Sequence, residues 1–268
     1  MPLHNPNFIE VTTSIGCPVN CFKYCPQEQL LKRYKGSHSF SMDDFKLALK
    51  TVKESTGICF SGFCEPFTNP NCVEMIEYAN KKGHDIIIYS TLVGLKEKDL
   101  PRLFEISVDY FFIHLPDAYN YAKIPITDEY MRVFFSVIKH FAISGFTSMN
   151  DEFISCGREN IARNLFPKRK NYSIRCYNLE HSQFILLPNG NLQLCCMDYT
   201  LSNKIGNLFT DDFTKIRDKV KTMHFELCHY CSNSKPKLLF TIVNFILRKY
   251  KGENIYALAI KRIMERID

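Results

Sequence analysis

Cysteine is the residue that most constrains this chain, because eight of its twelve cysteines fall into two groups. The members of the two groups are Cys17, Cys21 and Cys25 near the start, and Cys176, Cys195, Cys196, Cys228 and Cys231 in the last third. Residues 1–7 show no basic segment followed by an apolar run, so we expect a reduced, cytoplasmic chain rather than a secreted disulfide network. Clustered cysteines in such a chain indicate metal or redox chemistry.

Length and charge exclude several other classes of protein. A chain of 268 residues with 23% charged residues can bury a core without cross-links. The apolar stretch at residues 238–247 is half as long as the ~20 residues that a membrane-spanning helix needs. The net charge is +6, and eight basic against three acidic residues lie from Lys235 onward, so the surplus is local. We therefore expect no transmembrane segment and no nucleic-acid partner.

Hydrophobic patterning predicts an α/β fold with a parallel sheet. Short apolar strands without polar alternation take turns with helical segments, which is typical of a sheet covered by helices. The expected strands are 8–15, 57–61, 85–89 and 108–115, and the expected helices are 41–55, 71–82, 97–106 and 128–143, the last closed by Gly145. Five or six strand–helix units fit before residue 165, too few for a complete eight-fold barrel.

The pattern changes after Pro167. Two apolar runs, 184–187 and 192–196, flank Asn189-Gly190, which is a strong β-hairpin signal. A helix over 211–223 and two further helical segments at the C-terminus complete the expected elements.

Cys17, Cys21 and Cys25 follow the first predicted strand in a CxxxCxxxC pattern. Three thiolates on one loop can hold three corners of a cubane iron–sulfur cluster, and a zinc site or three unrelated cysteines are the alternatives. The loop resembles that of the radical SAM superfamily, whose usual motif is CxxxCxxC and which binds S-adenosylmethionine (SAM) at the open iron. The extra residue is Lys23, and an aromatic residue precedes the last cysteine, as is typical of that superfamily.

The segment after the second strand strengthens this resemblance. The segment from Phe60 to Pro66, which contains Gly62, resembles the glycine-rich segment that lines the SAM amino group in the superfamily. Glu65 stands at the carboxylate position, and Cys64 stands where glycine is commoner. The resemblance implies that Glu65 pairs with the amino group and that Cys64 is a packing residue. Ser90 and Thr91 end the third strand, where they contact the SAM ribose or simply cap the strand.

The second cysteine group resembles a twitch domain, the shortened form of the SPASM extension, which carries an auxiliary 4Fe–4S cluster. A lone Cys176, a hairpin cysteine and the pair Cys228 and Cys231 match it in order. The Gly-x4-Cys spacing selects Cys195, and we expect Cys196 to point the other way, since neighbours on a strand face opposite sides. A tetrahedral zinc site with the same four ligands is the alternative.

The resemblance implies an α/β architecture in three parts. Residues 1–165 form a partial (β/α)6 TIM-like barrel, residues 166–235 form a small twitch-type domain of hairpin and helix, and residues 236–268 form C-terminal helices. Within the superfamily, the layout is most similar to the twitch-bearing dehydrogenase that oxidises an aminocyclitol alcohol in butirosin biosynthesis.

That resemblance implies an oxidoreductase with two 4Fe–4S clusters and SAM. A 5′-deoxyadenosyl radical would remove hydrogen from a sugar or aminocyclitol, and the auxiliary cluster would accept an electron. A flavodoxin- or ferredoxin-type donor is the expected protein partner.

Two residues are candidate catalytic groups. Arg158 corresponds to a substrate-contacting arginine, and His114 at the end of a strand could bind a hydroxyl or relay a proton; a surface arginine and a structural histidine are the alternatives.

Other functions stay open. They are a sugar epimerase that returns hydrogen from Cys156 or Cys64, a peptide-modifying enzyme, and a non-catalytic zinc or iron–sulfur protein.

Overall fold

The computed structural model of the protein describes residues 7–21, 24–148, 174–176, 183–221, 223–229, 231 and 235–236. Within these residues, one eight-stranded sheet has the order β5-β4-β3-β2-β1-β7-β8-β9. Its first five strands in the chain run parallel, each beside the previous one. They are β1 (Phe8–Val11), β2 (Gly57–Phe60), β3 (Ile86–Ser90), β4 (Tyr110–His114) and β5 (Gly145–Thr147). The predicted α/β class and parallel sheet are confirmed.

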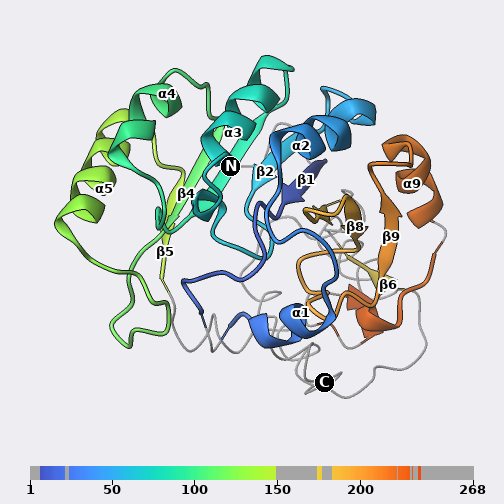
Figure 1. Cartoon of the computed structure of the whole chain (residues 1–268). Helices are drawn as coiled ribbons and strands as arrows, with labels where there is room; N and C mark the ends of the chain where they lie inside the picture. Colours follow the sequence, from blue (N-terminus) through green and yellow to red (C-terminus); the bar gives the residue numbers. More distant parts are fainter. Residues whose placement is uncertain are drawn as a thin grey trace, which may run out of the picture.

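Helices connect these strands, and all but the first of them lie along one side of the sheet (Figure 1). The α-helices are α1 (Gln27–Arg33), α2 (Met42–Ala48), α3 (Cys72–Lys81), α4 (Leu100–Phe104) and α5 (Asp128–His140). Short 3-10 turns are η1 (Leu49–Thr51), η2 (Pro66–Thr68) and η3 (Glu97–Asp99). The alternation of strand and helix brings the carboxyl ends of β1 to β5 to one edge of the sheet.

Local sequence signals explain where two of these helices begin. The Ser41 hydroxyl accepts a hydrogen bond from the Asp44 amide at 3.1 Å, as the predicted N-cap requires. Thr127 caps α5 in the same way, through the Tyr130 amide at 3.1 Å. Pro101 lies in the first turn of α4, where a missing amide hydrogen costs nothing.

The end of α5 differs from the prediction. The helix stops at His140, and Gly145 is the first residue of β5 rather than the cap of the helix. Phe141 is already extended, and β5 pairs with β4, with Gly145 opposite Phe112. Pairing with an open sheet edge therefore ends the helix earlier than its apolar period indicates.

The two faces of the parallel strands have different surroundings. Ile9 and Val11 on β1 pack into the main core together with residues of the helices, such as Phe45 and Met75. Phe8, on the opposite face, belongs to a separate cluster with Cys59 and Ile87, at the inner side of the partial barrel. The helix-facing side is thus closed by apolar packing, and the inner side is left to line a cavity.

The later strands extend the same sheet. The strand β7 (Phe184–Leu186) pairs with β1 in parallel. The strands β8 (Asn191–Gln193) and β9 (Lys204–Asn207) then continue the sheet with antiparallel pairing. The helix α9 (Phe213–Val220) and the 3-10 helix η4 (Glu226–His229) follow in the chain. Gly190, at φ +78°, completes the predicted hairpin turn. A second, two-stranded sheet joins β6 (Ile174–Arg175) to β10 (Lys235–Pro236).

Several predicted features lie outside the described residues. They include Lys23, Cys156, Arg158 and, apart from Pro236, the C-terminal helices expected over 236–268. Among the residues that are described, no helix combines the length and the apolar composition needed to cross a bilayer.

Candidate active site

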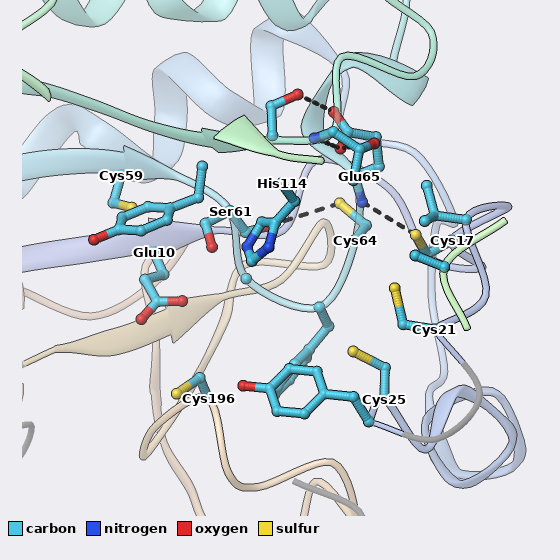
Figure 2. Close-up of a pocket in the computed structure, with 18 of the residues that line it drawn as sticks. Glu10, Cys17, Cys21, Cys25, Cys59, Ser61, Cys64, Glu65, His114 and Cys196 are labelled. Carbon is cyan, nitrogen blue, oxygen red and sulfur yellow. Dashed lines mark hydrogen bonds between the residues drawn. The ribbon is translucent and has the colours of Figure 1, made fainter. Parts of the chain in front are cut away.

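A cavity of about 380 Å³ opens at the carboxyl edge of the parallel strands. Residues at or just beyond four strand ends line it, one from each strand: Ser61, Ser90, His114 and Thr147. Cys17, Cys21 and Cys25 line it as well, and Figure 2 shows their three sulfur atoms on the same side. The edge where parallel α/β sheets bind their ligands is therefore also where the first cysteine group lies.

The cysteine loop is fixed by its own backbone and by its neighbours. The amide of Cys25 donates to the carbonyl of Cys21 at 2.7 Å, which links the second and third cysteines of the loop. The Glu65 amide donates to the Cys17 sulfur at 3.3 Å, so the loop after β2 contacts the cysteine loop directly. Burial, followed by the nearby charges of Cys64 and Glu65, raises the pKa of the Cys17 thiol to about 12.

Gly62 sets the path of the loop after β2. Its φ is +71°, and an added Cβ would clash with the Thr12 hydroxyl at the end of β1. That hydroxyl instead accepts a hydrogen bond from the Phe63 amide at 3.0 Å. Gly62, in the segment expected to line the SAM amino group, thus also lets two loops at the cavity pack together.

The carboxylate of Glu65 is buried and accepts four hydrogen bonds. The Oε1 atom accepts from the Ser90 hydroxyl at 2.5 Å and from the Phe67 amide at 3.4 Å. The Oε2 atom accepts from the amide and the hydroxyl of Thr91 at 2.6 and 2.7 Å. Burial raises the pKa of this carboxyl to about 7, and the four hydrogen bonds oppose that rise.

These contacts bring three of the predicted site residues together, in a way that the sequence did not indicate. Ser90 and Thr91 donate to Glu65, whereas the sequence left open a contact with the SAM ribose or a cap at the end of the strand. Four hydrogen bonds occupy the lone-pair positions of both oxygens of a carboxylate. The Glu65 carboxylate therefore anchors the end of β3 to the loop after β2, and its expected ion pair with an amino group stays a prediction.

Cys64 also lies at the cavity, beside the end of β1. Its sulfur accepts from the Ser14 amide at 3.4 Å and lies 3.5 Å from the Thr13 hydroxyl. Burial raises the pKa of this thiol to about 11. Hydrogen bonding to the β1 loop agrees with the packing role expected of Cys64.

His114 lines the cavity from the end of β4, as predicted. Its Nδ1 atom lies 2.6 Å from the Thr147 hydroxyl at the end of β5. This hydrogen bond fixes the ring orientation across two neighbouring strands.

Several cavity residues have no counterpart among the predicted site residues. They are on the inner face of the barrel or in the hairpin region: Glu10, Cys59, Tyr89, Gln183, Cys196 and Tyr199. Glu10 could have been found from the sequence, because it is a charged residue within the otherwise apolar first strand. The structure buries it, with only 8% of the residue exposed. Gln183 is similarly buried just before β7.

The second cysteine group lies beyond the hairpin. The charges of Cys196, Cys231 and Cys228 act on Cys195, and the charge of Cys176 acts on Cys228, so the four predicted ligands are neighbours and Cys196 lies beside them. Burial is the largest cause that raises the pKa of both Cys195 and Cys228. No disulfide joins the described cysteines. In the described part of the chain, no three His, Cys, Asp or Glu side chains converge closely enough to hold a single metal ion.

Cys195 and Cys196 point to different places, but not for the reason we gave. The strand β8 ends at Gln193, so both cysteines lie in the turn that follows it. Cys196 lines the cavity of the first cysteine group (Figure 2), whereas Cys195 lies with Cys228 and Cys231. The two thiols share this turn and remain neighbours, since the charge of Cys196 also acts on Cys195 and both pack against Met197 and Cys231.

Asp198 organises that turn and was not predicted. It is fully buried, its amide donates to the Cys195 carbonyl at 3.1 Å, and its carboxylate accepts from the amides of Ser202 and Asn203 at 3.1 and 2.8 Å. The Thr200 hydroxyl donates to the same carboxylate at 3.2 Å. Asp198 therefore holds the backbone that carries Cys195.

Comparisons with known proteins give matches only among solved structures. No family model matches the chain, and no curated protein matches it. BtrN in complex with AdoMet and 2-DOIA matches with a TM-score of 0.59 and 18% identity, over 81% of this chain and 84% of that chain. BtrN in an open conformation matches with a TM-score of 0.53 and 16% identity, over 81% and 82%.

A third structure, native anSMEcpe with bound AdoMet, matches with a TM-score of 0.50 and 12% identity, over 85% of this chain and 86% of that chain. At these identities the likeness concerns the fold. The chain has the mixed α/β fold of radical SAM enzymes, a partial barrel with a parallel sheet, followed by antiparallel strands.

Proposed function

We propose that the protein is a radical SAM enzyme whose Cys17, Cys21 and Cys25 hold a 4Fe–4S cluster. The observation that carries this proposal is the meeting of two loops at one cavity. The three thiols and the loop from Gly62 to Glu65 line it together, at the carboxyl edge of a parallel sheet. The likeness of the fold to structures that contain AdoMet supports SAM as the ligand of this cavity.

The donors present fit such a cluster. Three thiols around a cavity of about 380 Å³ suit a group of several atoms better than one ion, because the described acidic, histidine and cysteine side chains do not converge on a point. Three ligands also leave one iron open for SAM. The Glu65 amide, which donates to the Cys17 sulfur, would remain a hydrogen-bond donor to the ligating thiolate.

With SAM, such a cluster supplies a 5′-deoxyadenosyl radical that removes hydrogen from a C–H bond, and a second cluster supplies an acceptor for the electron that oxidation releases. The chain's own residues bind and orient the reactants and exclude water. Gly62 and Thr12 hold the loop after β2 in place, and Glu65 joins it to the end of β3. Buried Phe63 and Tyr199, whose ring centroids are 4.3 Å apart, close the cavity on the hairpin side.

The second cluster is proposed for Cys176, Cys195, Cys228 and Cys231. The charges of Cys228 and Cys231 on Cys195, and of Cys176 on Cys228, support this set. The charge of Cys196 acts on Cys195 as well, but Cys196 also lines the other cavity, which favours leaving it out of the set. Four thiolates leave no open iron, so its role would be electron transfer. A flavodoxin- or ferredoxin-type protein would supply the electrons.

We infer that the reaction is oxidation of an alcohol on a carbohydrate or aminocyclitol. His114, held by Thr147, has its ring at the strand end where substrate would lie and can accept the hydroxyl proton. Arg158, outside the described residues, remains a candidate for the same task.

Epimerisation is the second candidate, and Cys196 favours it. Its thiol lines the cavity and could return a hydrogen atom to the opposite face of the substrate carbon. The resulting sulfur radical would then need one electron and one proton, for which the electron donor and water are the sources.

Anaerobic reconstitution tests the proposal. We expect about eight irons per chain, matched sulfide, and dithionite-dependent conversion of SAM to 5′-deoxyadenosine and methionine. Cys17→Ala should lose the conversion, whereas Cys72→Ala, which removes a buried thiol that does not line the cavity, should keep it. Stoichiometric zinc with no SAM cleavage would overturn the proposal.

The mass of the product distinguishes the two candidate reactions. A product two hydrogens lighter than the substrate supports oxidation, and an isomer with one solvent hydrogen supports epimerisation.

A further inference from the structure

A buried glutamine lines the cavity at the end away from the cysteine loop. Gln183 directly precedes β7, and only 6% of the residue is exposed. The parallel pairing of Ile9 with Phe184 places Gln183 beside Phe8, the first residue of β1. Gln183 therefore lies at the amino ends of two central strands, whereas the cysteine loop follows the carboxyl end of β1.

Strand alternation directs the Gln183 side chain toward the cavity. Phe184 and Leu186 of β7 pack into the main core, on the side of the helices. Ile185 packs on the opposite face in a cluster with Phe63, which lines the cavity. Gln183 is two residues before Ile185 and so shares its face.

The folded chain does not use the Gln183 amide. In the described part of the chain, no protein group forms a hydrogen bond with it. By contrast, Ser90 and Thr91, which line the same cavity, donate to Glu65. The neighbouring Phe8 is apolar and offers no partner. A side-chain amide carries two donors and an acceptor, so a buried one that the protein leaves unpaired favours a polar molecule in the cavity.

The position of Gln183 leaves room for a small molecule beside the cysteine end. The strand β1 has four residues, so its two ends are about 10 Å apart at the usual rise of a strand. Figure 2 shows Cys59, which packs with Phe8, on the side away from the cysteine loop. The cysteine end is assigned to the cluster and SAM, so the Gln183 end is left for the substrate.

An aromatic ring belongs to the same wall of the cavity. Tyr89 lines it from β3 and packs against the cluster of Phe8, Cys59 and Ile87. The Tyr89 ring stacks on Phe112, with centroids 4.4 Å apart and planes 8° apart. A neutral amide near an aromatic ring suits a ring polyol. The C–H face of such a molecule packs on the aromatic surface, and its hydroxyls both donate to and accept from an amide.

We propose that Gln183 is a specificity residue that binds a hydroxyl of the substrate at the end remote from the reacting carbon. This inference rests on the proposed function and adds the residue that holds the substrate in the inner part of the barrel. A molecule without that hydroxyl leaves the buried amide unpaired and is rejected for that reason. Gln183 thus selects hydroxylated substrates and helps to set which carbon faces the cysteine loop.

The test uses Gln183→Met, which keeps the length of the side chain and removes its hydrogen-bonding atoms. Denaturant unfolding of the apoprotein measures any structural role. We expect the midpoint to stay the same or to rise, because no protein hydrogen bond is lost. Calorimetry with the reconstituted, SAM-loaded and unreduced full-length protein measures binding of two neutral polyols, scyllo-inositol and D-glucose. The variant should bind the preferred polyol about 10- to 100-fold more weakly and SAM within about twofold of the wild type.

A matched control makes the same chemical change outside the cavity. Gln29→Met lies on α1 and does not line the cavity, so polyol binding and the unfolding midpoint should both stay unchanged.

Four results would overturn the inference: binding of neither polyol by the wild type, unchanged polyol binding in Gln183→Met, equal losses of SAM and polyol binding, or a lower unfolding midpoint of this variant. The last result includes failure to fold, and it would assign the amide a structural role. Failure of the proposed function has a different signature, because iron content and SAM cleavage by the wild type report it without a polyol.

Discussion

The two cysteine groups of this chain are assembled in different ways. Cys17, Cys21 and Cys25 lie within nine residues, on one loop between β1 and α1. The other four proposed ligands come from separate segments: the end of β6, the turn after β8, and η4 with the residues after it. The first group therefore depends mainly on local backbone, whereas the second depends on how distant segments pack. Substitutions that disturb packing should damage the second group first.

The largest effect is expected in the first group. Cys25→Ala leaves two thiols, and we expect complete loss of SAM cleavage together with retention of the auxiliary iron, about half of the total. Cys21→Ala should behave alike, since both line the same cavity. Iron analysis with a 5′-deoxyadenosine assay measures both effects. Full cleavage by Cys25→Ala would show that the CxxxCxxxC pattern does not supply the ligands.

The next prediction compares the adjacent residues Cys195 and Cys196. Cys195→Ala should lose about half of the iron, because its thiol lies with Cys228 and Cys231. Cys196→Ala should keep all of it, because that thiol lines the other cavity. The reverse pattern of iron contents would exchange the roles of the two residues.

Asp198 tests whether the second group depends on tertiary structure. Asp198→Ala removes the acceptor for Ser202, Asn203 and Thr200, and we expect a loss of about 2–4 kcal/mol of unfolding free energy in the apoprotein. The auxiliary cluster should be lost selectively, since this turn carries Cys195. Denaturant titration and iron content measure the two effects. Unchanged iron would mean that the turn forms without the carboxylate.

Gly62 is the corresponding test for the first site, with a smaller expected effect. Gly62→Ala forces a side chain into positive φ and against the Thr12 hydroxyl, at a cost of about 1–3 kcal/mol. SAM binding, measured by calorimetry, should weaken while iron content stays normal. Adding Thr12→Ala should recover part of the loss if the clash contributes to it. No recovery would assign the whole effect to backbone strain.

Much of the fold followed from sequence because its signals are local. Ser41 accepts from the amide three residues on, and Asn189-Gly190 forms the hairpin turn, so both contacts lie within one short segment. The early end of α5 did not follow, because it depends on the pairing of β5 with β4. The apolar period of the helix continues through residues 141–143 in the sequence. It contains no information on whether the residues that follow pair with a neighbouring strand.

For the site, the chemistry of the thiol groups and their division into two sets could be read from the sequence, since residue type and short spacing decide which groups one loop can present. The folded chain was needed to show that Ser90 and Thr91 donate to Glu65, that Cys196 lines the first cavity, and that Glu10 lies on the inner face. These contacts join residues far apart in the chain. Their geometry depends on strand register and loop packing, which no local pattern records.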